Sequence, residues 1–290
     1  MKFLTAFYDL THGPVSYDFV TWLVRARFIA NQRGLEGLHV VIVPKEDGLG
    51  GFARHWGEHT EAATRWRLQH IVVASCPLMR ATVTVAPSQA MAIRIRQSED
   101  DTWWEPGKAH FMGPLVEASR NGHAIPKLKA TDQAREYVKA WLEPYAKPVA
   151  TLTQRSQTTD PARNTNAAEW ALLADWLVAQ GYKVVGLFDS HVELAGGRGY
   201  AVLSPDLRLA LYEYAKVNVI GNNGPQELLK FSDAPYVAMG QALTAGWKDH
   251  FRKYFGMAVG EQLPWAREDQ RLVYEPDTFE NMKRVVSGHR

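Results

Sequence analysis

Two glycines and two asparagines separate an apolar segment from an expected helix in the stretch VNVIGNNGPQELL at 217–229. Glycine permits backbone conformations and close approaches that other residues do not. Pro225 suits the first position of a helix, and the free N–H groups of a helix start can bind a phosphate. We therefore expect Asn222, Asn223 and Gly224 to contribute to an anion site. An ordinary strand-to-helix turn stays open as the alternative.

Other polar residues follow two expected strands of the same half. Arg155 ends PVATLTQR, and a guanidinium there could bind a phosphate through two hydrogen bonds. Arg163, Asn164 and Asn166 in the next loop could add donors. Asp189 ends VVGLFD and could orient a ribose or sugar hydroxyl. The alternatives are a surface ion pair for Arg155 and a turn cap for Asp189. Loops at the carboxyl ends of parallel strands converge on one edge, where ligands bind.

A candidate general base lies near the N-terminus, in the loop DLTHGPVSYD that follows the first expected strand. Histidine is the side chain most often used as a general base, so His12 could accept the proton of a hydroxyl group. Asp18, or the neighbouring Asp9, could perform or support the same task. A loop histidine that only makes a structural hydrogen bond is the alternative. We take His12 and Asp18 as the catalytic candidates.

Two patterns could in principle bind a metal, and we assign neither. HWGEH places His55 and His59 four residues apart with Glu58 between them, which matches a zinc pattern. Gly57 interrupts that motif, so a solvated helix start is the favoured interpretation. Glu99-Asp100-Asp101 lies in a charged loop and not directly after a clear strand. The tryptophans that follow this loop are expected mainly in the core, with stacking on a sugar as the minority interpretation.

The hydrophobic pattern predicts strands that alternate with helices. Strands are expected at 2–9, 38–44, 81–88, 148–155, 182–189 and 217–220. Helices are expected at 16–34, 131–145, 167–181, 207–216 and from 225, with two more near the C-terminus. Residues 91–130 give no clear assignment.

This order predicts an α/β fold of two Rossmann-like parallel-sheet domains that face a cleft. We expect an N-terminal, acceptor-side domain at 1–140 and a C-terminal, nucleotide-sugar-binding domain at 141–290. The final helix could pack back on the N-terminal domain.

Composition excludes several classes of protein. The chain of 290 residues has 33 basic and 31 acidic residues, a balance that argues against a dedicated nucleic-acid-binding protein. The single cysteine, Cys76, excludes an internal disulfide framework and fits a reducing compartment. No apolar segment approaches the roughly 20 residues of a membrane span, and the N-terminus does not match a signal peptide. We expect a cytoplasmic protein, with contact at the inner face of the membrane left open.

The second half resembles the nucleotide-binding domain of two-domain, GT-B-type glycosyltransferases. PVATLTQR, the loop reaching RNTN, EWALLADWLVAQGYKVV and LYEYAKVNVIGNNGPQELL carry the resemblance, which is to the fucosyltransferase and heptosyltransferase branches and covers about 148–240. The N-terminal half is similar only in its opening strand–helix–strand unit. The His-x-Arg-Arg arrangement of the fucosyltransferases is missing, since TQRSQ stands in its place, and this puts the identity of the donor in doubt.

The resemblance implies that a sugar moves from a nucleotide-diphosphate donor to a hydroxyl of a glycan or lipid-linked acceptor, as in cell-envelope glycan synthesis, with no cofactor and no obligatory metal. Arg155 and the amides at Asn223 and Gly224 would then stabilise the leaving diphosphate. Asn222 and Asp189 would fix the nucleotide or sugar, and His12 or Asp18 would deprotonate the acceptor. Two alternatives stay open: a sugar-nucleotide epimerase of similar architecture, and a non-catalytic protein that binds a nucleotide or a sugar.

Overall fold

Two parallel β-sheets organise the chain. The computed structural model describes residues 2–45, 61–105, 107, 111–157, 161–189 and 204–288. This part forms a four-stranded sheet in the order β3-β2-β1-β4 and a five-stranded sheet in the order β6-β5-β7-β8-β9. Every neighbouring pair of strands is parallel. The prediction of an α/β fold with two Rossmann-like parallel sheets is therefore confirmed.

The elements follow one another along the chain as strands with intervening helices. The strands are β1 (Phe3–Asp9), β2 (Gly37–Val43), β3 (Thr82–Val85), β4 (Thr102–Trp103), β5 (Val149–Arg155), β6 (Lys183–Asp189), β7 (Val217–Ile220), β8 (Tyr236–Ala238) and β9 (Gln270–Leu272). The α-helices are α1 (Asp18–Gln32), α3 (Glu61–Arg67), α4 (Gln89–Ser98), α5 (Gly113–Arg120), α6 (Asp132–Leu142), α7 (Ala167–Ala179), α9 (Pro205–Tyr214), α10 (Gln226–Lys230), α11 (Ala245–His250) and α12 (Phe279–Ser287). Short 3-10 or π turns are η2 (Leu68–Val73), η3 (Cys76–Met79), η4 (Glu143–Tyr145), η5 (Pro161–Arg163) and η7 (Phe251–Phe255). None of these helices combines the length and the apolar character that a bilayer crossing requires.

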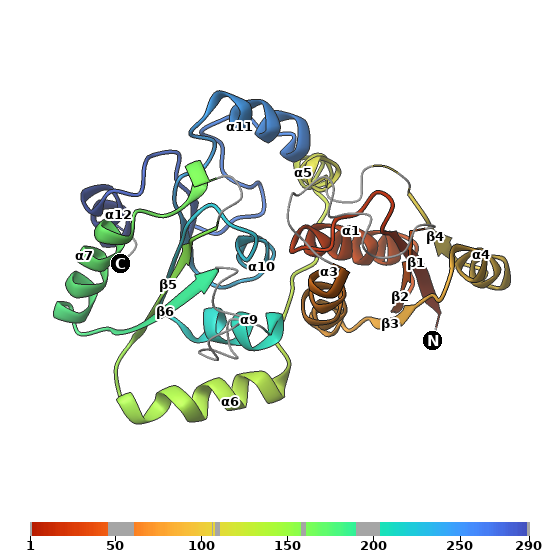
Figure 1. The fold of residues 1–290 in the computed structure, drawn as a ribbon, viewed down its shortest axis with the longest axis horizontal. Helices are drawn as coiled ribbons and strands as arrows, with labels where there is room; N and C mark the ends of the chain where they lie inside the picture. The colour runs from red at the N-terminus through yellow and green to blue at the C-terminus, as the bar shows by residue number, and fades with distance from the viewer. Residues whose placement is uncertain are drawn as a thin grey trace.

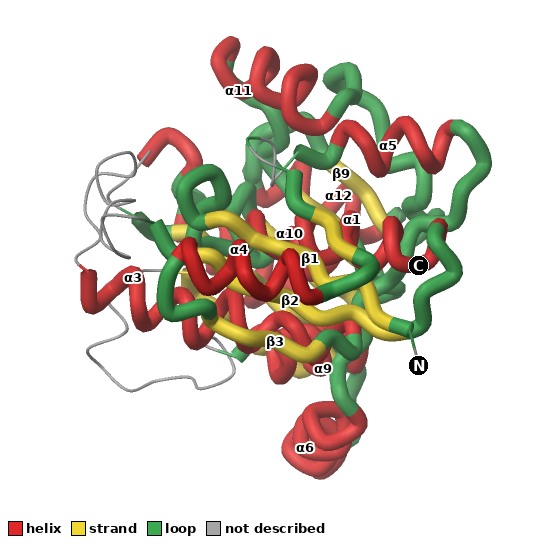
Figure 2. The backbone as a smooth tube through the Cα atoms, turned by 90° about the vertical axis from the view of Figure 1, so that its right-hand side faces the viewer, coloured by secondary structure: helices red, strands yellow, loops and turns green. Residues whose placement is uncertain are grey.

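The first sheet is covered on both faces, as the continuous apolar sequences of β1 and β2 require. These strands pair from Phe3 with Gly37 to Asp9 with Val43. Helix α1 buries its apolar side on one face of the sheet. On the other face lies α4, whose Ala92 joins a small cluster with Phe7 and Val41. Figure 2 shows α4 in front of β1 and β2.

The second sheet lies between two helical layers. On one face α7 and α12 bury Trp170, Leu173 and Met282 against strand residues such as Leu152 and Val219. On the other face lie α9 and α10, and α12 and α7 are the elements farthest from the first sheet in Figure 1. The expectation that the final helix packs back on the N-terminal domain is corrected here. The buried apolar residues of α7 and α12 belong to one cluster beside the second sheet, so the two helices pack against each other there.

One apolar layer joins the two halves. Helices α1 and α10 lie between the sheets, and residues from both halves, such as Phe19, Leu23 and Leu228, belong to one continuous cluster (Figure 1). The connecting segment then runs along the second half. In α6, Arg135 Nε donates to Glu213 Oε2 of α9 at 2.7 Å. The predicted division at residue 140 therefore falls inside a helix that packs on the second half.

The chain's single thiol lies in the apolar layer and gives a first test of the fold. Cys76 has 0% exposure, and its Sγ–H donates to the carbonyl oxygen of Val72. Burial raises the pKa of this thiol to about 12. Because the thiolate is the reactive form, we expect no modification by a thiol reagent at pH 8 in the native protein and complete modification after unfolding. Mass spectrometry after timed labelling checks this, and fast native labelling would contradict the packing.

Candidate functional site

The strand order places a binding position at the centre of the second sheet. From β5 the chain moves first to β6 on one side and then to β7 on the other. Ligands of open parallel sheets bind outside the carboxyl ends of the strands at such a reversal. Arg155 is the last residue of β5, and Gly221 follows β7, where its N–H donates to the carbonyl of Thr153 at 3.0 Å. The two loops singled out from the sequence therefore lie side by side.

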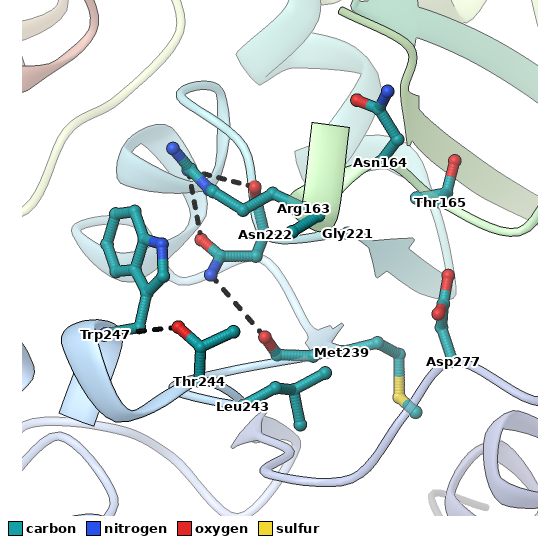
Figure 3. Close-up of a pocket in the computed structure, with 12 residues that line it drawn as sticks. Arg163, Asn164, Thr165, Gly221, Asn222, Met239, Leu243, Thr244, Trp247 and Asp277 are labelled. Atoms are coloured by element: carbon teal, nitrogen blue, oxygen red, sulfur yellow. Dashed lines mark hydrogen bonds between the residues drawn. The ribbon is translucent and has the colours of Figure 1, made fainter. Parts of the chain in front are cut away.

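A hollow opens at this edge (Figure 3). It holds about 420 Å³ of empty space, part of it open solvent. Its walls come from the loops after three neighbouring strands, β5, β7 and β8, and from two later segments. They are Ala162, Arg163, Asn164 and Thr165; Gly221 and Asn222; Met239, Gly240, Leu243 and Thr244; and Trp247 and Asp277. The site thus combines one cation, one carboxylate, several amide and hydroxyl groups and an apolar wall.

Arg163 is the basic residue that lines the hollow. Its Nη2 donates to the carbonyl oxygen of Asn222 at 3.0 Å and to Oδ1 of the same residue at 3.2 Å. The guanidinium lies over the ring of Trp247, 4.3 Å from the ring centroid. These contacts hold the cation against the turn after β7 (Figure 3). The sequence indicated Arg163 only as an additional donor.

Arg155 lies behind the wall of the hollow. Its side chain is 3% exposed, and its Nη1 donates to Oδ1 of Asn164 at 2.6 Å. Asn164 in turn donates from Nδ2 to the carbonyl of Gln157 at 2.9 Å. The structure therefore brings Arg155 and Asn164 together. Asn164 faces the hollow, and the buried cation fixes the orientation of its amide.

A carboxylate closes the opposite side. Asp277 Oδ2 accepts hydrogen bonds from the indole Nε1 of Trp170 at 2.6 Å and from the backbone N–H of Asn166 at 3.2 Å. Asn166 itself is exposed at the N-cap of α7, with no capping hydrogen bond from its side chain. Asp189 is the last residue of β6 and lies opposite Arg155 in the register of β5 and β6. Its side chain lies outside the described residues.

The turn after β7 contains a buried side-chain amide, that of Asn223. Asn223 is 1% exposed, and neither atom of its side-chain amide has a hydrogen-bond partner among the described residues. Such groups are rare in folded proteins, because desolvation without a partner is costly. The helix that follows, α10, has only five residues. Its N-terminal N–H groups therefore bind an anion less strongly than the helix start that the sequence predicted. The side chains of the turn therefore matter more than the helix end.

The loop after β1 reaches this turn directly. Tyr17 packs on Gly224, where an added Cβ would lie 3.2 Å from the ring atom Cδ2. The next residue, Asp18, begins α1, and its Oδ2 accepts a hydrogen bond from Ser16 Oγ at 2.7 Å. Together with burial, the negative charge of Asp18 raises the pKa of the buried Tyr8.

His12 lies in the same loop and is exposed. Its backbone N–H donates to the carbonyl of Asp9 at 3.0 Å. The loop therefore presents both catalytic candidates, and Asp18 is the one adjacent to the contact with the second half.

The acidic run at 99–101 and the two tryptophans after it lie beside the first sheet. Trp103 stacks on Trp22 and Trp104 on Phe7, with centroids 5.5 Å and 5.0 Å apart, so both rings belong to the packing of that sheet. In the acidic run, Glu99 accepts a hydrogen bond from Thr5. Within the described ranges no three His, Cys, Asp or Glu residues cluster closely enough to hold a metal ion. The HWGEH motif with His55 and His59 lies outside these ranges.

Comparison with solved structures finds likenesses over the whole chain. E. coli ADP-heptose LPS heptosyltransferase II is 14% identical, over 100% of this chain and 98% of that one, with a TM-score of 0.49. E. coli heptosyltransferase WaaC with ADP is 14% identical over 100% of both chains, with a TM-score of 0.48. A glycosyl transferase family 9 protein from Veillonella parvula is 11% identical over 82% of this chain and 80% of that one, with a TM-score of 0.45. No family model and no curated protein matches the chain. Two of these three structures are heptosyltransferases, and the third is named as a glycosyl transferase family 9 protein.

The contact between Gly221 and Thr165 yields a test of the site's geometry. A Cβ at Gly221 would lie 2.6 Å from Cγ2 of Thr165, whose Oγ1 donates to the carbonyl of Arg155 at 3.1 Å. We expect Gly221→Ala to displace Thr165 and to lower the free energy of unfolding by about 1–3 kcal/mol. Adding Thr165→Ser removes Cγ2 but keeps the hydroxyl, and most of the stability should return in urea titrations.

Gly246→Ala is the matched control for this substitution. A Cβ at Gly246, in α11, meets nothing within 4 Å, and alanine favours a helix over glycine, so this substitution should not lower the free energy of unfolding. A Gly221→Ala protein as stable as the wild type would show that Thr165 does not pack against the turn.

Proposed function

We propose that the protein is a glycosyltransferase that moves a sugar from a nucleotide-diphosphate donor to a hydroxyl acceptor. The observation that carries the proposal is the packing of Tyr17 on Gly224. This contact brings the loop with His12 and Asp18 next to the turn with the buried amide of Asn223, which has no hydrogen-bond partner in the described part of the chain. A proton acceptor and a site for an anionic, hydrogen-bonding ligand therefore adjoin each other.

The donor would bind at the hollow of the second half. In this proposal Asn222, Asn223 and Gly224 contact the diphosphate, and Asn223 finds the partner that it lacks among the described residues. The positive charge of Arg163 lies at the same turn, and Arg155 supports it from behind Asn164. Preorganised cations and donors of this kind stabilise the charge that develops on a leaving phosphate.

The nucleoside would occupy the remaining walls. Leu243 and Trp247 offer apolar surface for a base. Asp277 has one oxygen engaged by Trp170 and Asn166, and its other oxygen could accept a hydrogen bond from a ribose hydroxyl. The sequence-based roles of Asn166 and Asp189 at the nucleotide or sugar belong to the same proposal.

The transfer itself needs a group to accept the acceptor's proton. As the acceptor oxygen bonds to the anomeric carbon, the bond from that carbon to the diphosphate breaks, and the electron pair leaves with the diphosphate. The hydroxyl proton passes to a base, for which Asp18 is the first candidate and His12 the second. The cationic side chains at the turn take the role of charge stabilisation, so the proposal includes no obligatory metal. The acceptor is proposed as a glycan or lipid-linked glycan.

A substitution of Asn223 should raise the stability of the fold and weaken donor binding at the same time. Asn223→Leu removes a buried amide that has no partner among the described residues, so we expect the free energy of unfolding to rise by about 1 kcal/mol. Donor binding should weaken by about 1.5–3 kcal/mol, as for a lost hydrogen bond to a charged group. Urea titration and calorimetry with a panel of nucleotide-diphosphate sugars measure the two effects.

Asn218→Leu is the matched control for the amide. Asn218 is also fully buried, but its Nδ2 donates to the carbonyl oxygens of Tyr212 and Pro235 at 3.0 and 2.7 Å. This variant should lose stability by at least about 1 kcal/mol. A fall in stability for Asn223→Leu with unchanged donor affinity would discard the assigned role of Asn223.

Asp18→Asn separates catalysis from binding. The amide cannot accept the acceptor's proton, so the turnover number should fall by about 10²–10⁴-fold while the dissociation constant of the donor stays unchanged. The assay is the release of nucleoside diphosphate, compared with and without a hydroxyl acceptor. His12→Gln, measured in parallel, shows which residue is the base.

The same assay distinguishes the alternatives. Release without any acceptor would point to hydrolysis of the donor, and conversion of the donor into another nucleotide sugar without net release would point to an epimerase. Donor binding without turnover in the wild type would leave a nucleotide- or sugar-binding protein.

A further inference from the structure

A buried hydrogen bond joins the two halves next to the proposed catalytic residues. Thr21 Oγ1 on α1 donates to Glu227 Oε2 on α10 at 2.9 Å. Thr21 is 2% exposed and Glu227 5% exposed. The two residues are 206 positions apart in the chain, so the bond connects elements that have no local link.

Both partners lie on the elements that carry the proposed chemistry. Thr21 follows Asp18 by three residues, which places both on the same side of α1. Glu227 follows Gly224 by three residues and lies in the helix that continues the donor turn. A rotation or slide of α1 on α10 would therefore move Asp18 relative to the turn. The hydrogen bond is sensitive to such motion, because its strength depends on distance and angle.

The carboxylate is held firmly from its own side. Glu227 Oε1 accepts a hydrogen bond from Lys230 Nζ at 2.7 Å. Lys230 is 1% exposed, and its ammonium lies 4.5 Å from the centroid of the Phe255 ring. A buried charge pair is stable only when its remaining hydrogen-bonding positions are also filled. Thr21 fills one of them from the other half of the molecule.

Several other polar contacts between the halves, among the described residues, come from the connecting segment. The backbone bonds Met112 to Tyr254 and Leu128 to Phe231 belong to the segment that connects the two sheets. Thr21, by contrast, lies in the helix that packs directly on the first sheet. It fixes the position of that helix and not that of the connection.

We propose that Thr21 is a positioning residue, which through its hydrogen bond to Glu227 holds the loop with Asp18 in register with the turn at 221–225. The catalytic part of this inference rests on the proposed function. The mechanical part, that the bond restricts motion of one half against the other, does not.

The experiment compares three substitutions in the full-length protein. Thr21→Val keeps the shape and removes the donor, and Thr21→Ser keeps the donor. Thr5→Val is the matched control, since the equally buried Thr5 donates to the carboxylate of Glu99 at 3.3 Å within the first half. Urea titration confirms that each variant is folded. If Thr21→Val does not fold, Thr21→Ala replaces it.

Spin labels report the position of one half against the other. The labels are attached at Gln97→Cys on α4 and Leu172→Cys on α7, both exposed, while the buried Cys76 stays unlabelled. We expect pulsed resonance to give a broader distance distribution for Thr21→Val than for the wild type. Thr21→Ser and Thr5→Val should give the wild-type distribution. An unchanged distribution in Thr21→Val, or an equal broadening in Thr5→Val, overturns the proposal.

Turnover gives the second measurement. For Thr21→Val we expect kcat to fall about tenfold, which corresponds to about 1.4 kcal/mol, with an unchanged KM for the donor. Thr21→Ser should restore kcat. An unchanged kcat, or a loss that appears in KM alone, contradicts the catalytic part. If the wild type transfers no sugar, the proposed function fails, and the label distances still decide whether Thr21 holds the halves in register.

Discussion

The approach of Tyr17 to Gly224 is the contact on which the arrangement of the site depends. The ring lies close against the turn because position 224 has no Cβ; an added Cβ would be 3.2 Å from the ring and would push it slightly away. The contact is held in place by the apolar layer of α1 and α10, which runs without interruption from one sheet to the other. Close packing of this kind resists displacement, so the two loops keep a fixed separation.

Several polar groups are buried within or beside this layer. Glu227 and Lys230 form an ion pair, and the guanidinium of Arg208 lies 5.9 Å from the centroid of the Tyr17 ring. Apolar residues of similar size would often give equal or greater stability at such positions. Hydrogen bonds between polar groups, unlike apolar contacts, form only at particular distances and angles. The layer therefore combines apolar packing, which supplies stability, with hydrogen bonds that select one orientation of the helices.

Much of the fold could be predicted from the sequence, because its signals are local. The strands β1, β2, β5 and β6 are apolar runs, and the starts of α6 and α12 are marked by Thr131 and Thr278, whose side chains accept capping hydrogen bonds. Strands β8 and β9 have three residues each, too few for a periodic pattern. The roles of Trp247 and Asp277 escaped notice for the same reason, since they follow these short strands. The choice between Arg155 and Arg163 at the hollow depends on side-chain direction, which spacing along the chain does not determine.

The strand orders explain why the two halves present their loops to each other. In the first sheet the chain leaves β1 toward β2 and β3 and later places β4 on the other side, so the loop after β1 lies at a reversal. In the second sheet the reversal lies between β5 and β7. Each sheet thus has its favoured binding position at the loop that touches the other half. A single-substrate protein needs only one such position. In the proposed function, these two adjoining positions, with Asp18 and His12 on one side and amides and guanidinium groups on the other, would take the two molecules that the reaction joins.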